Sequence, residues 1–208
     1  MGAAGGHALT VRRLFDLLVA SVGLVLASPF LLAAVIAIPL ESRGSAFYRQ
    51  RRVGLDGHEF EVVKLRTMVS GAEQMGAGLA VTENDDRITR LGALLRRTSL
   101  DEVPNLLNVL RGEMSIIGPR PTVPDQVARY TPRQRERLSI RPGITGWAQV
   151  NGRTGLDWDE RIELDLWYID NRSPALDAEI LRRTAAIVVG GEGLYRDGSP
   201  AWRDPDER

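Results

Sequence analysis

The clearest hydrophobic pattern in the chain is a stretch of 24 residues without charge, residues 17–40. As one α-helix this stretch would be about 36 Å long, whereas the hydrocarbon core of a bilayer is ~30 Å thick. It is apolar on all sides, while a helix in a soluble core has polar residues along one face. A signal peptide has a shorter apolar region and a small-residue cleavage site. The pattern therefore favours a membrane-inserted helix over a signal peptide or a core helix.

Whether this helix crosses the membrane is a separate question. Ser28-Pro29 divides the stretch into two halves of twelve residues, and proline is expected to bend a helix because it lacks a backbone donor. Arginines flank both ends: Arg12, Arg13, Arg43, Arg49, Arg51 and Arg52. The positive-inside rule gives no orientation for a span but is satisfied if both ends stay in the cytoplasm. A re-entrant hairpin broken at Ser28-Pro29 is favoured, and a straight transmembrane anchor remains the alternative.

After residue 40 the hydrophobic pattern becomes that of a globular domain. Residues 47–52 and 59–65 have the composition of short strands and are joined by a Gly-Leu-Asp-Gly turn, which predicts a β-hairpin. Residues 147–150, inside a glycine-rich segment, predict another strand. Residues 68–86 have no strong period and predict a loop. Helices are predicted over 88–97, from 99 or 104 to 110, and over 123–138, 158–170 and 175–189.

These elements predict an α+β fold in two parts. The first part, 1–40, is an N-terminal re-entrant membrane helix hairpin. The second part, 41–208, is a small, mostly helical globular domain with a short β-hairpin and amphipathic surface helices. The helix over 175–189 has a long apolar stripe that suits either a membrane surface or the core.

Composition narrows the possible functions. The chain has 208 residues, with 27 basic and 27 acidic side chains and no cysteine. It therefore has no disulfide framework and no thiolate zinc site, and zero net charge argues against nucleic acid as a partner. Of the basic residues only Lys64 is lysine, which hints that a compact charge is needed there.

The acidic pair Asp101-Glu102, called the dyad below, is a candidate for chemistry. One interpretation is a helix capping box with Ser99 as the N-cap residue and Glu102 three positions later. Pro104 counts against it, since proline would then stand where a helix donor is needed. The helix would then begin nearer Pro104, and the carboxylates would lie before its N-terminus.

Basic residues are dense around the dyad in the sequence: Lys64, Arg66, Arg87, Arg90, Arg96, Arg97, Arg111 and Arg120. Arg120 is distinctive because prolines 119 and 121 restrict its backbone, and its planar fork matches phosphate oxygens. Carboxylates close to several cations suggest a site for a phosphorylated substrate, with a divalent metal between carboxylate and phosphate. The chain has no P-loop and no GxGxxG motif.

Four long motifs, at 47–68, 87–121, 141–153 and 163–170, resemble those of the bacterial sugar transferase family. These proteins are the monotopic phosphoglycosyl transferases, or polyprenyl-phosphate sugar-1-phosphate transferases, and the resemblance, from residue 12 to 195, is to their minimal catalytic form. It implies transfer of a sugar-1-phosphate from a UDP-sugar to a polyprenyl phosphate, usually undecaprenyl phosphate, with release of UMP. It also implies a role in bacterial glycan assembly, at the cytoplasmic face of the inner membrane, with membrane lipid as a partner.

The resemblance assigns roles to individual residues. Asp101 is expected to attack the sugar-linked phosphate and form a covalent intermediate, and Glu102 to be a metal ligand or a base. Magnesium is the expected cofactor, with manganese as a substitute, bound by Asp101 and Glu102. Phosphate-binding positions are Arg120, Arg96, Lys64 and Arg66, and the membrane-helix break is Ser28-Pro29.

Two other functions remain open at this point. One is a catalytically silent membrane scaffold for glycan assembly, which would tolerate loss of the dyad. The other is a metal-dependent phosphohydrolase of nucleotide sugars, which would release sugar phosphate without lipid. Surface helices near the C-terminus would permit a homodimer.

Overall fold

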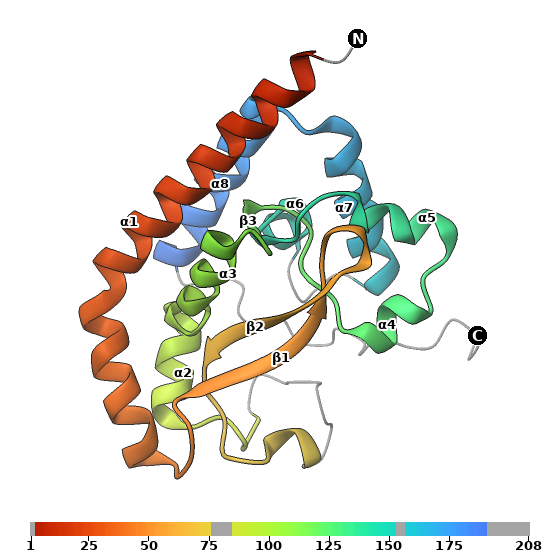
Figure 1. Cartoon of the computed structure of the whole chain (residues 1–208). Helices are drawn as coiled ribbons and strands as arrows, with labels where there is room; N and C mark the ends of the chain where they lie inside the picture. The colour runs from red at the N-terminus through yellow and green to blue at the C-terminus, as the bar shows by residue number, and fades with distance from the viewer. Residues whose placement is uncertain (1–2, 76–84, 153–156, 191–208) are drawn as a thin grey trace.

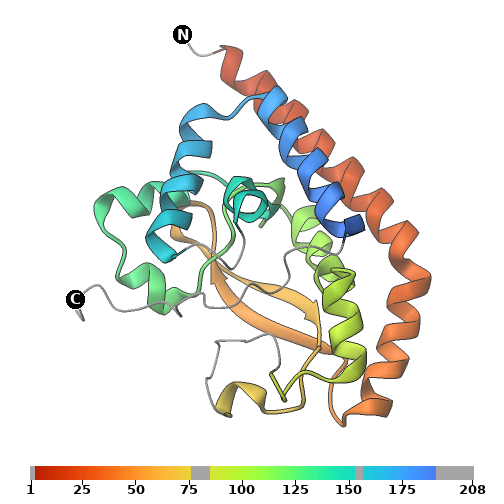
Figure 2. The ribbon, with the colours of Figure 1, turned by 180° about the vertical axis from the view of Figure 1, so that it is seen from behind.

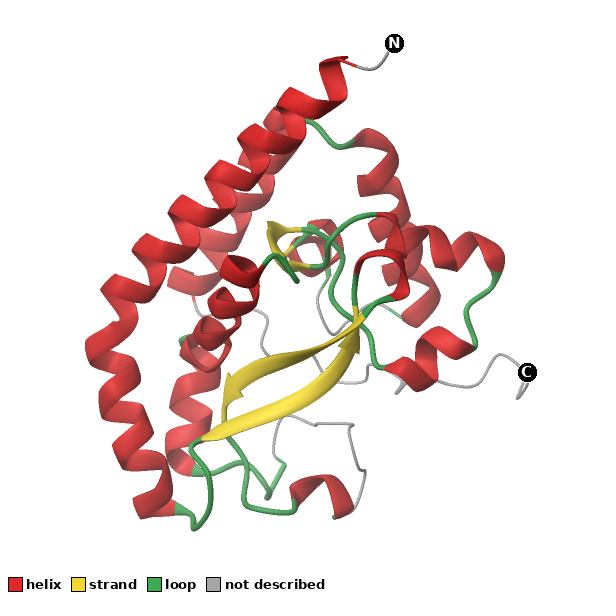
Figure 3. Cartoon of the chain, viewed as in Figure 1, coloured by secondary structure: helices red, strands yellow, loops and turns green. Residues whose placement is uncertain are grey.

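The computed structural model describes residues 3–75, 85–152 and 157–190. The long helix α1 (Ala3–Glu41) runs along one side of a smaller body of helices and strands (Figure 1). The helix α8 (Pro174–Gly190) lies beside its N-terminal half, as the opposite view also shows (Figure 2). The predicted mixed, mostly helical fold is confirmed (Figure 3).

The other elements are, in order, β1 (Phe47–Val53), η1 (Leu55–Gly57), β2 (Glu59–Leu65), η2 (Ala72–Gln74), α2 (Arg90–Arg97), η3 (Leu100–Asn105), α3 (Leu106–Arg111), β3 (Ser115–Ile117), α4 (Pro124–Ala128), α5 (Pro132–Arg135), η4 (Glu136–Ser139), β4 (Gly143–Thr145), α6 (Trp147–Asn151) and α7 (Trp158–Asn171). Here η denotes a 3-10 helix. The predicted helices over 88–97, 158–170 and 175–189 correspond to α2, α7 and α8, while η2 lies in the predicted loop over 68–86. Residues 76–84 of that loop lie outside the described residues.

The helix α1 exposes large apolar side chains along most of its length. The segment Val11–Glu41 is long and apolar enough to cross a membrane. Its most exposed apolar side chains, each at least 60% accessible, are Val11, Leu14, Leu18, Val25, Leu26, Phe30, Leu32, Ile36 and Leu40. A soluble monomer rarely exposes so large an apolar surface to water. The helix therefore indicates association with a membrane.

The predicted break at Ser28-Pro29 is not a gap in α1. The helix continues through Pro29, and its axis changes direction part-way along (Figure 1). The Ser28 hydroxyl donates to the Val25 carbonyl at 2.8 Å, a local bond that often accompanies helix bending. The structure thus has one bent helix here and does not show a hairpin of two half-helices.

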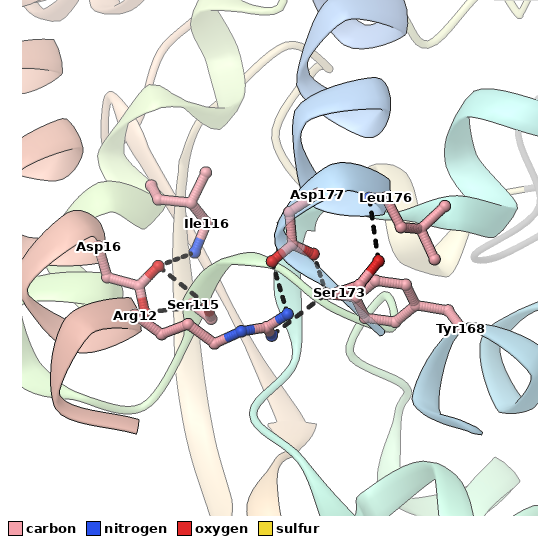
Figure 4. Close-up of polar contacts among 8 residues, drawn as sticks. All are labelled: Arg12, Asp16, Ser115, Ile116, Tyr168, Ser173, Leu176 and Asp177. Atoms are coloured by element: carbon pink, nitrogen blue, oxygen red, sulfur yellow. Dashed lines mark hydrogen bonds and ion pairs between the residues drawn. The ribbon is translucent and has the colours of Figure 1, made fainter. Parts of the chain in front are cut away.

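Polar side chains fasten the N-terminal half of α1 to the body (Figure 4). The buried Asp16 accepts hydrogen bonds from the Ile116 amide at 2.8 Å and from the Ser115 hydroxyl. Arg12 forms an ion pair with Asp177 of α8 at 2.5 Å, and the Tyr168 hydroxyl donates to the same carboxylate. This group holds α1 against β3, α7 and α8.

The C-terminal end of α1 is fastened to the same body. The Glu41 carboxylate accepts hydrogen bonds from the Arg90 amide at 2.9 Å and from the Leu91 amide at 3.1 Å. These amides are the open donors of the first turn of α2. Both ends of the apolar segment of α1 are therefore bound to one polar body.

The predicted β-hairpin is confirmed. β1 and β2 pair antiparallel with Tyr48 opposite Lys64. Two buried amides cover the free edge of β2, because Asn105 accepts from the Val63 amide at 3.1 Å and Asn108 donates to the Glu61 carbonyl at 2.6 Å. Both amides belong to the η3–α3 segment, which brings that segment against the hairpin.

Two predicted elements are wrong. The helix over 123–138 is interrupted by a turn, after which Pro132 begins α5 with a capping box from Thr131 to Gln134, as its missing amide donor allows. The strand over 147–150 is the helix α6, and the nearby strand is β4, which pairs parallel with β3. A Cβ on Gly143 would lie 2.1 Å from the Gly118 nitrogen, so this close pairing requires glycine.

The main core lies between α1, the hairpin, α3 and the last two helices. Its buried members are Ala20, Phe60, Val62, Val109, Met114, Ile116, Ile117, Tyr168 and Ile180. These residues come from nearly the whole length of the chain. The body and the N-terminal half of α1 therefore form one packed unit rather than a domain with a free anchor.

Candidate active site

The dyad lies in the first turn of η3, directly after an unusual backbone position. Ser99 has a φ of +56° and its side chain caps no helix amide. The capping-box interpretation is therefore wrong. The chain enters η3 through this left-handed residue, and Pro104 is accommodated inside the 3-10 segment before α3 begins at Leu106. The two carboxylates are thus not used to start a helix.

Glu102 is held by two cations from other parts of the fold. One carboxylate oxygen accepts from Lys64 Nζ at 2.7 Å and from Arg120 at 2.8 Å. Lys64 comes from β2, and Arg120 from the turn after β3. Burial alone would raise the pKa of Glu102, but Arg120 and Lys64 hold that pKa well below its usual range. Glu102 therefore remains a carboxylate that fixes both cations.

The pKa of Asp101 is shifted in the opposite direction. Burial, and then the neighbouring charge of Glu102, raise the pKa of Asp101 above its usual range, while Lys64, Arg96 and Arg120 oppose that rise. Among the described residues none donates a hydrogen bond to its carboxylate. Its oxygens are consequently not committed to a donor of the described residues and could bind a cation or attack an electrophilic phosphorus atom.

Hydrogen bonds to its backbone hold the turn that carries Arg120 in place. The Gly118 amide donates to the Thr145 carbonyl at 2.9 Å, and the Gly143 amide to the Pro119 carbonyl at 2.9 Å. Arg137, which is buried, donates to the Arg120 carbonyl at 2.9 Å. These bonds fix the backbone, so the guanidinium needs little further ordering to meet an anion.

Arg96 lies close to the dyad, whereas Arg66 binds a different segment of the chain. Arg96 donates to the Thr67 hydroxyl at 2.8 Å and its charge acts on Asp101. The Arg66 guanidinium instead binds the segment that follows α1, with bonds to the Ser45 carbonyl at 2.6 Å and the Ser42 hydroxyl at 2.8 Å. Of the predicted phosphate-binding residues, the structure brings Lys64, Arg96 and Arg120 to the dyad and uses Arg66 to hold a loop.

Sequence reasoning missed Arg52 as a member of this site. Arg52 lies on β1 and lines the same hollow as Lys64, Glu102 and Arg120. The rest of the hollow is formed by Val62, Asn105, Met114, Pro121, Gly143 and Ile144. Alternation along a strand could have found it, since residues 48, 50 and 52 share one face, and Tyr48 on that face is paired with Lys64.

The carboxylates fit a divalent cation that is shared with a substrate. Among the described residues there is no group of three or more metal-ligating side chains, so a site built from protein ligands alone is not found there. Magnesium is typically bound by one or two carboxylates together with substrate phosphates and water. The open Asp101, with Glu102 beside it, suits that mode of binding.

Comparison with known proteins adds to this geometry. The family model of the bacterial sugar transferases matches residues 7–191. The chain is 41% identical over 188 residues to the uncharacterized sugar transferase EpsL of Bacillus subtilis, which covers 90% of this chain and 92% of EpsL. It is 42% identical over 193 residues to the UDP-glucose:undecaprenyl-phosphate glucose-1-phosphate transferase of Caulobacter vibrioides, covering 88% of this chain and 72% of that protein.

A third relative is much longer than this chain. The UDP-N-acetylgalactosamine-undecaprenyl-phosphate N-acetylgalactosaminephosphotransferase of Aeromonas hydrophila is 41% identical over 189 residues, covering 88% of this chain but 44% of that protein. The range matched by the family model includes Lys64, the dyad and Arg120. Because the family model matches most of the chain, the chain belongs to the bacterial sugar transferase family and is a transferase.

Proposed function

We propose that this protein transfers a sugar-1-phosphate from a UDP-sugar to a polyprenyl phosphate and releases UMP. The observation that carries the proposal is the asymmetry of the dyad. Glu102 is fixed by two cations, while Asp101 is adjacent, receives no hydrogen bond from the described residues and has a raised pKa. One carboxylate thus organises the phosphate-binding cations and the other is open for attack.

In the first step an Asp101 oxygen attacks the phosphorus that carries the sugar. The new bond is an acyl phosphate, the bond between that phosphorus and the oxygen bridging to UMP breaks, and UMP leaves with the electron pair. Lys64 and Arg120 stabilise the charge that develops on the phosphoryl oxygens. A nucleophile with a raised pKa is more basic, which favours attack once its proton is lost.

In the second step a phosphate oxygen of the lipid attacks the same phosphorus. A phosphoanhydride bond forms between lipid and sugar phosphate, and the bond to Asp101 breaks, so the carboxylate is regenerated. Two displacements allow one small site to serve a soluble donor and a lipid acceptor in turn. Mg²⁺ held by Asp101, Glu102 and the diphosphate would neutralise the charge of the donor.

We further propose that α1 is re-entrant, with both ends on the cytoplasmic face of the bacterial inner membrane. Two observations support this placement: Arg12 and Asp16 at one end and Glu41 at the other are all bound to the same polar body. A straight span would have to draw that body into the bilayer, at a high cost for its charges. The bend in α1 would let the helix enter and leave one leaflet, which holds the dyad near the lipid phosphate.

The topology can be tested by labelling because the chain has no cysteine. We expect Gly5→Cys and Ser45→Cys to react with a membrane-impermeant thiol reagent from the same side of inner-membrane vesicles. Reaction from opposite sides would exclude the re-entrant placement. Either result leaves the proposed chemistry intact, since the two proposals rest on different residues.

The reaction is tested by UMP release with purified protein, magnesium and a panel of donors. The names of the relatives suggest UDP-glucose and UDP-N-acetylgalactosamine as the first donors. We expect catalytic UMP release only with undecaprenyl phosphate, and a single stoichiometric burst without it. Catalytic release without lipid would instead indicate hydrolysis of the donor, and silence with every donor would contradict the proposed transfer.

The covalent step has its own test. With radiolabelled donor and no lipid, the wild-type chain should retain one sugar phosphate on the peptide that contains Asp101. Asp101→Asn should retain none and should lose transfer, while remaining folded and membrane-bound. Full turnover by Asp101→Asn would exclude this residue as the nucleophile.

A further inference from the structure

Arg52 occupies an unusual position among the arginines of β1. Alternation along the strand turns Arg49 and Arg51 outward, where their side chains are 67% and 76% exposed. Arg52 is partly buried and faces the hollow that also contains Lys64, Glu102 and Arg120. One short strand therefore carries two solvated arginines and one directed at the candidate site.

The charges of Glu102 and Glu73 act on Arg52 and oppose the shift of its pKa, but neither carboxylate forms an ion pair with it. The hydrogen-bond partner of Arg52 is the neutral side chain of Gln50, and among the described residues no carboxylate forms an ion pair with it. Lys64 and Arg120, by contrast, both bind Glu102. Burial, and then repulsion from Arg120, lower the pKa of Arg52 to about 10. Desolvating a cation without a counter-ion is unfavourable, so this arrangement suits a ligand that brings negative charge.

The charges of the side chains that line the hollow lead to the same conclusion. Three cations, Arg52, Lys64 and Arg120, face the single carboxylate of Glu102. The other carboxylate, Asp101, is the proposed nucleophile and is consumed in the covalent intermediate. A donor diphosphate, or an acceptor phosphate beside the phosphosugar, brings a second phosphate group. Lys64 and Arg120, already joined through Glu102, do not account for that second group.

We propose that Arg52 binds this second phosphate, the one that Asp101 does not attack. The inference rests on the proposed function and deepens it by giving the site a further phosphate-binding position. The planar guanidinium can donate two parallel hydrogen bonds to two phosphate oxygens. The phosphate has two chemical sources: the nucleotide phosphate that leaves as UMP, or the headgroup of the polyprenyl phosphate.

The test measures binding rather than turnover. The detergent-solubilised full chain is titrated with UMP in one arm and with farnesyl phosphate, a short prenyl phosphate, in the other. Arg52→Met removes the charge and keeps an apolar stem in the hollow. Arg51→Met is the matched control, because Arg51 is the next residue on the same strand and is solvated, 3.8 Å from Glu59.

We expect Arg52→Met to weaken one of the two ligands by about 10- to 100-fold, the range for a lost charge-assisted hydrogen bond. Weakening of UMP identifies the nucleotide phosphate, and weakening of farnesyl phosphate identifies the lipid headgroup. Arg51→Met should bind both ligands as the wild type does. Arg52→Lys keeps the charge without the fork and should be intermediate, which provides a second variant if Arg52→Met does not fold.

Three results would overturn the inference: unchanged binding of both ligands by Arg52→Met, an equal loss in Arg51→Met, or a wild-type chain that binds neither ligand. These outcomes are separate from failure of the proposed function. Absence of lipid-dependent UMP release would refute the transfer reaction, while a selective loss of UMP binding in Arg52→Met would still establish the phosphate site. Normal turnover with unchanged binding in Arg52→Met would refute the phosphate site alone.

Discussion

Two clusters of charge lie on either side of the turn that carries Arg120, and they are built in opposite ways. Behind the turn, Arg137 is paired with Asp165 at 2.6 Å, and both side chains are almost fully buried. Each Arg137 nitrogen has an acceptor, supplied by Asp165, Thr122, Tyr130 or the Arg120 carbonyl. In front of the turn, the dyad cluster keeps one open carboxylate, Asp101.

The difference separates a cluster that stabilises the fold from a cluster that could bind a ligand. In the first cluster every nitrogen of Arg137 has an acceptor, which gives the cluster rigidity, while the buried Asp165 Oδ1 has no hydrogen-bond partner among the described residues. In the second cluster Arg52 faces the hollow without an ion pair among the described residues, and Asp101 accepts no hydrogen bond from them, which is unfavourable until a charged ligand binds. Arg120 joins the two, because its carbonyl belongs to the first cluster and its guanidinium to the second. The closed cluster is thus expected to determine stability and the open one to determine activity.

The largest effect on stability is expected from breaking the closed cluster. Asp165→Asn leaves Arg137 buried without its counter-ion, which typically costs about 3–5 kcal/mol. Chemical denaturation should show that loss in the free energy of unfolding. Transfer should fall as well, because the backbone that positions Arg120 loses its brace.

The matched control for this prediction lies on the same helix. Glu163 of α7 forms an ion pair with Arg133 at 3.0 Å, and both side chains are 58% exposed. Glu163→Gln should therefore change stability by less than about 0.5 kcal/mol. Equal losses in the two variants would mean that the buried cluster is no more important for folding than a surface ion pair.

A smaller and opposite effect is expected in the open cluster. Burial and Glu102 raise the pKa of Asp101, so at neutral pH the ionised carboxylate costs folding free energy. Asp101→Asn should therefore raise the melting temperature, by roughly 2–4 °C if the gain is about 1 kcal/mol. Thermal unfolding of the ligand-free protein measures it.

Glu102→Gln provides the contrast. The pKa of Glu102 is lowered by Arg120 and Lys64, so its charge stabilises the fold at neutral pH, and that contribution is lost as pH falls through the lowered pKa. This variant should melt at a lower temperature than the wild type. A lower melting temperature in both variants would show that both carboxylates of the dyad stabilise the fold. The distinction between the open and the closed cluster would then be lost.

Local patterns predicted much of the fold. The hairpin and the helices α2, α7 and α8 follow from alternation, periodicity and turn residues, which act over a few neighbours. Of the two failures, the break in the helix over 123–138 has a local cause in Thr131 and Pro132, whereas the misplaced strand depends on a distant contact. Residues 147–150 have strand-like composition, but Gly143 and Gly118 approach too closely for other residues, so the strand begins four residues earlier, at Gly143.

The candidate site was predicted only in part for the same reason. Asp101, Glu102 and Arg120 stand out in the sequence by their pairing and by flanking prolines. Arg52 and Arg66 do not, because one arginine is told from another by the partners it meets in three dimensions. Arg66 meets the carbonyl of Ser45 and Arg52 meets the hollow, and neither partner can be inferred from residues nearby in the sequence.

The finest comparison concerns pH. Because the pKa of Asp101 is raised, its proton should be lost at a higher pH than that of an ordinary aspartate. The rate of the UMP burst should therefore fall as the pH drops through this raised pKa, since the protonated carboxyl cannot attack. Glu102→Gln removes a negative neighbour and leaves Lys64 and Arg120 to act on Asp101, so its burst should persist to lower pH even where its amplitude is smaller. If the pH dependence of the burst rate is the same in Glu102→Gln as in the wild type, the charge of Glu102 does not affect the pKa of Asp101. Burial, and not the neighbouring carboxylate, would then raise that pKa.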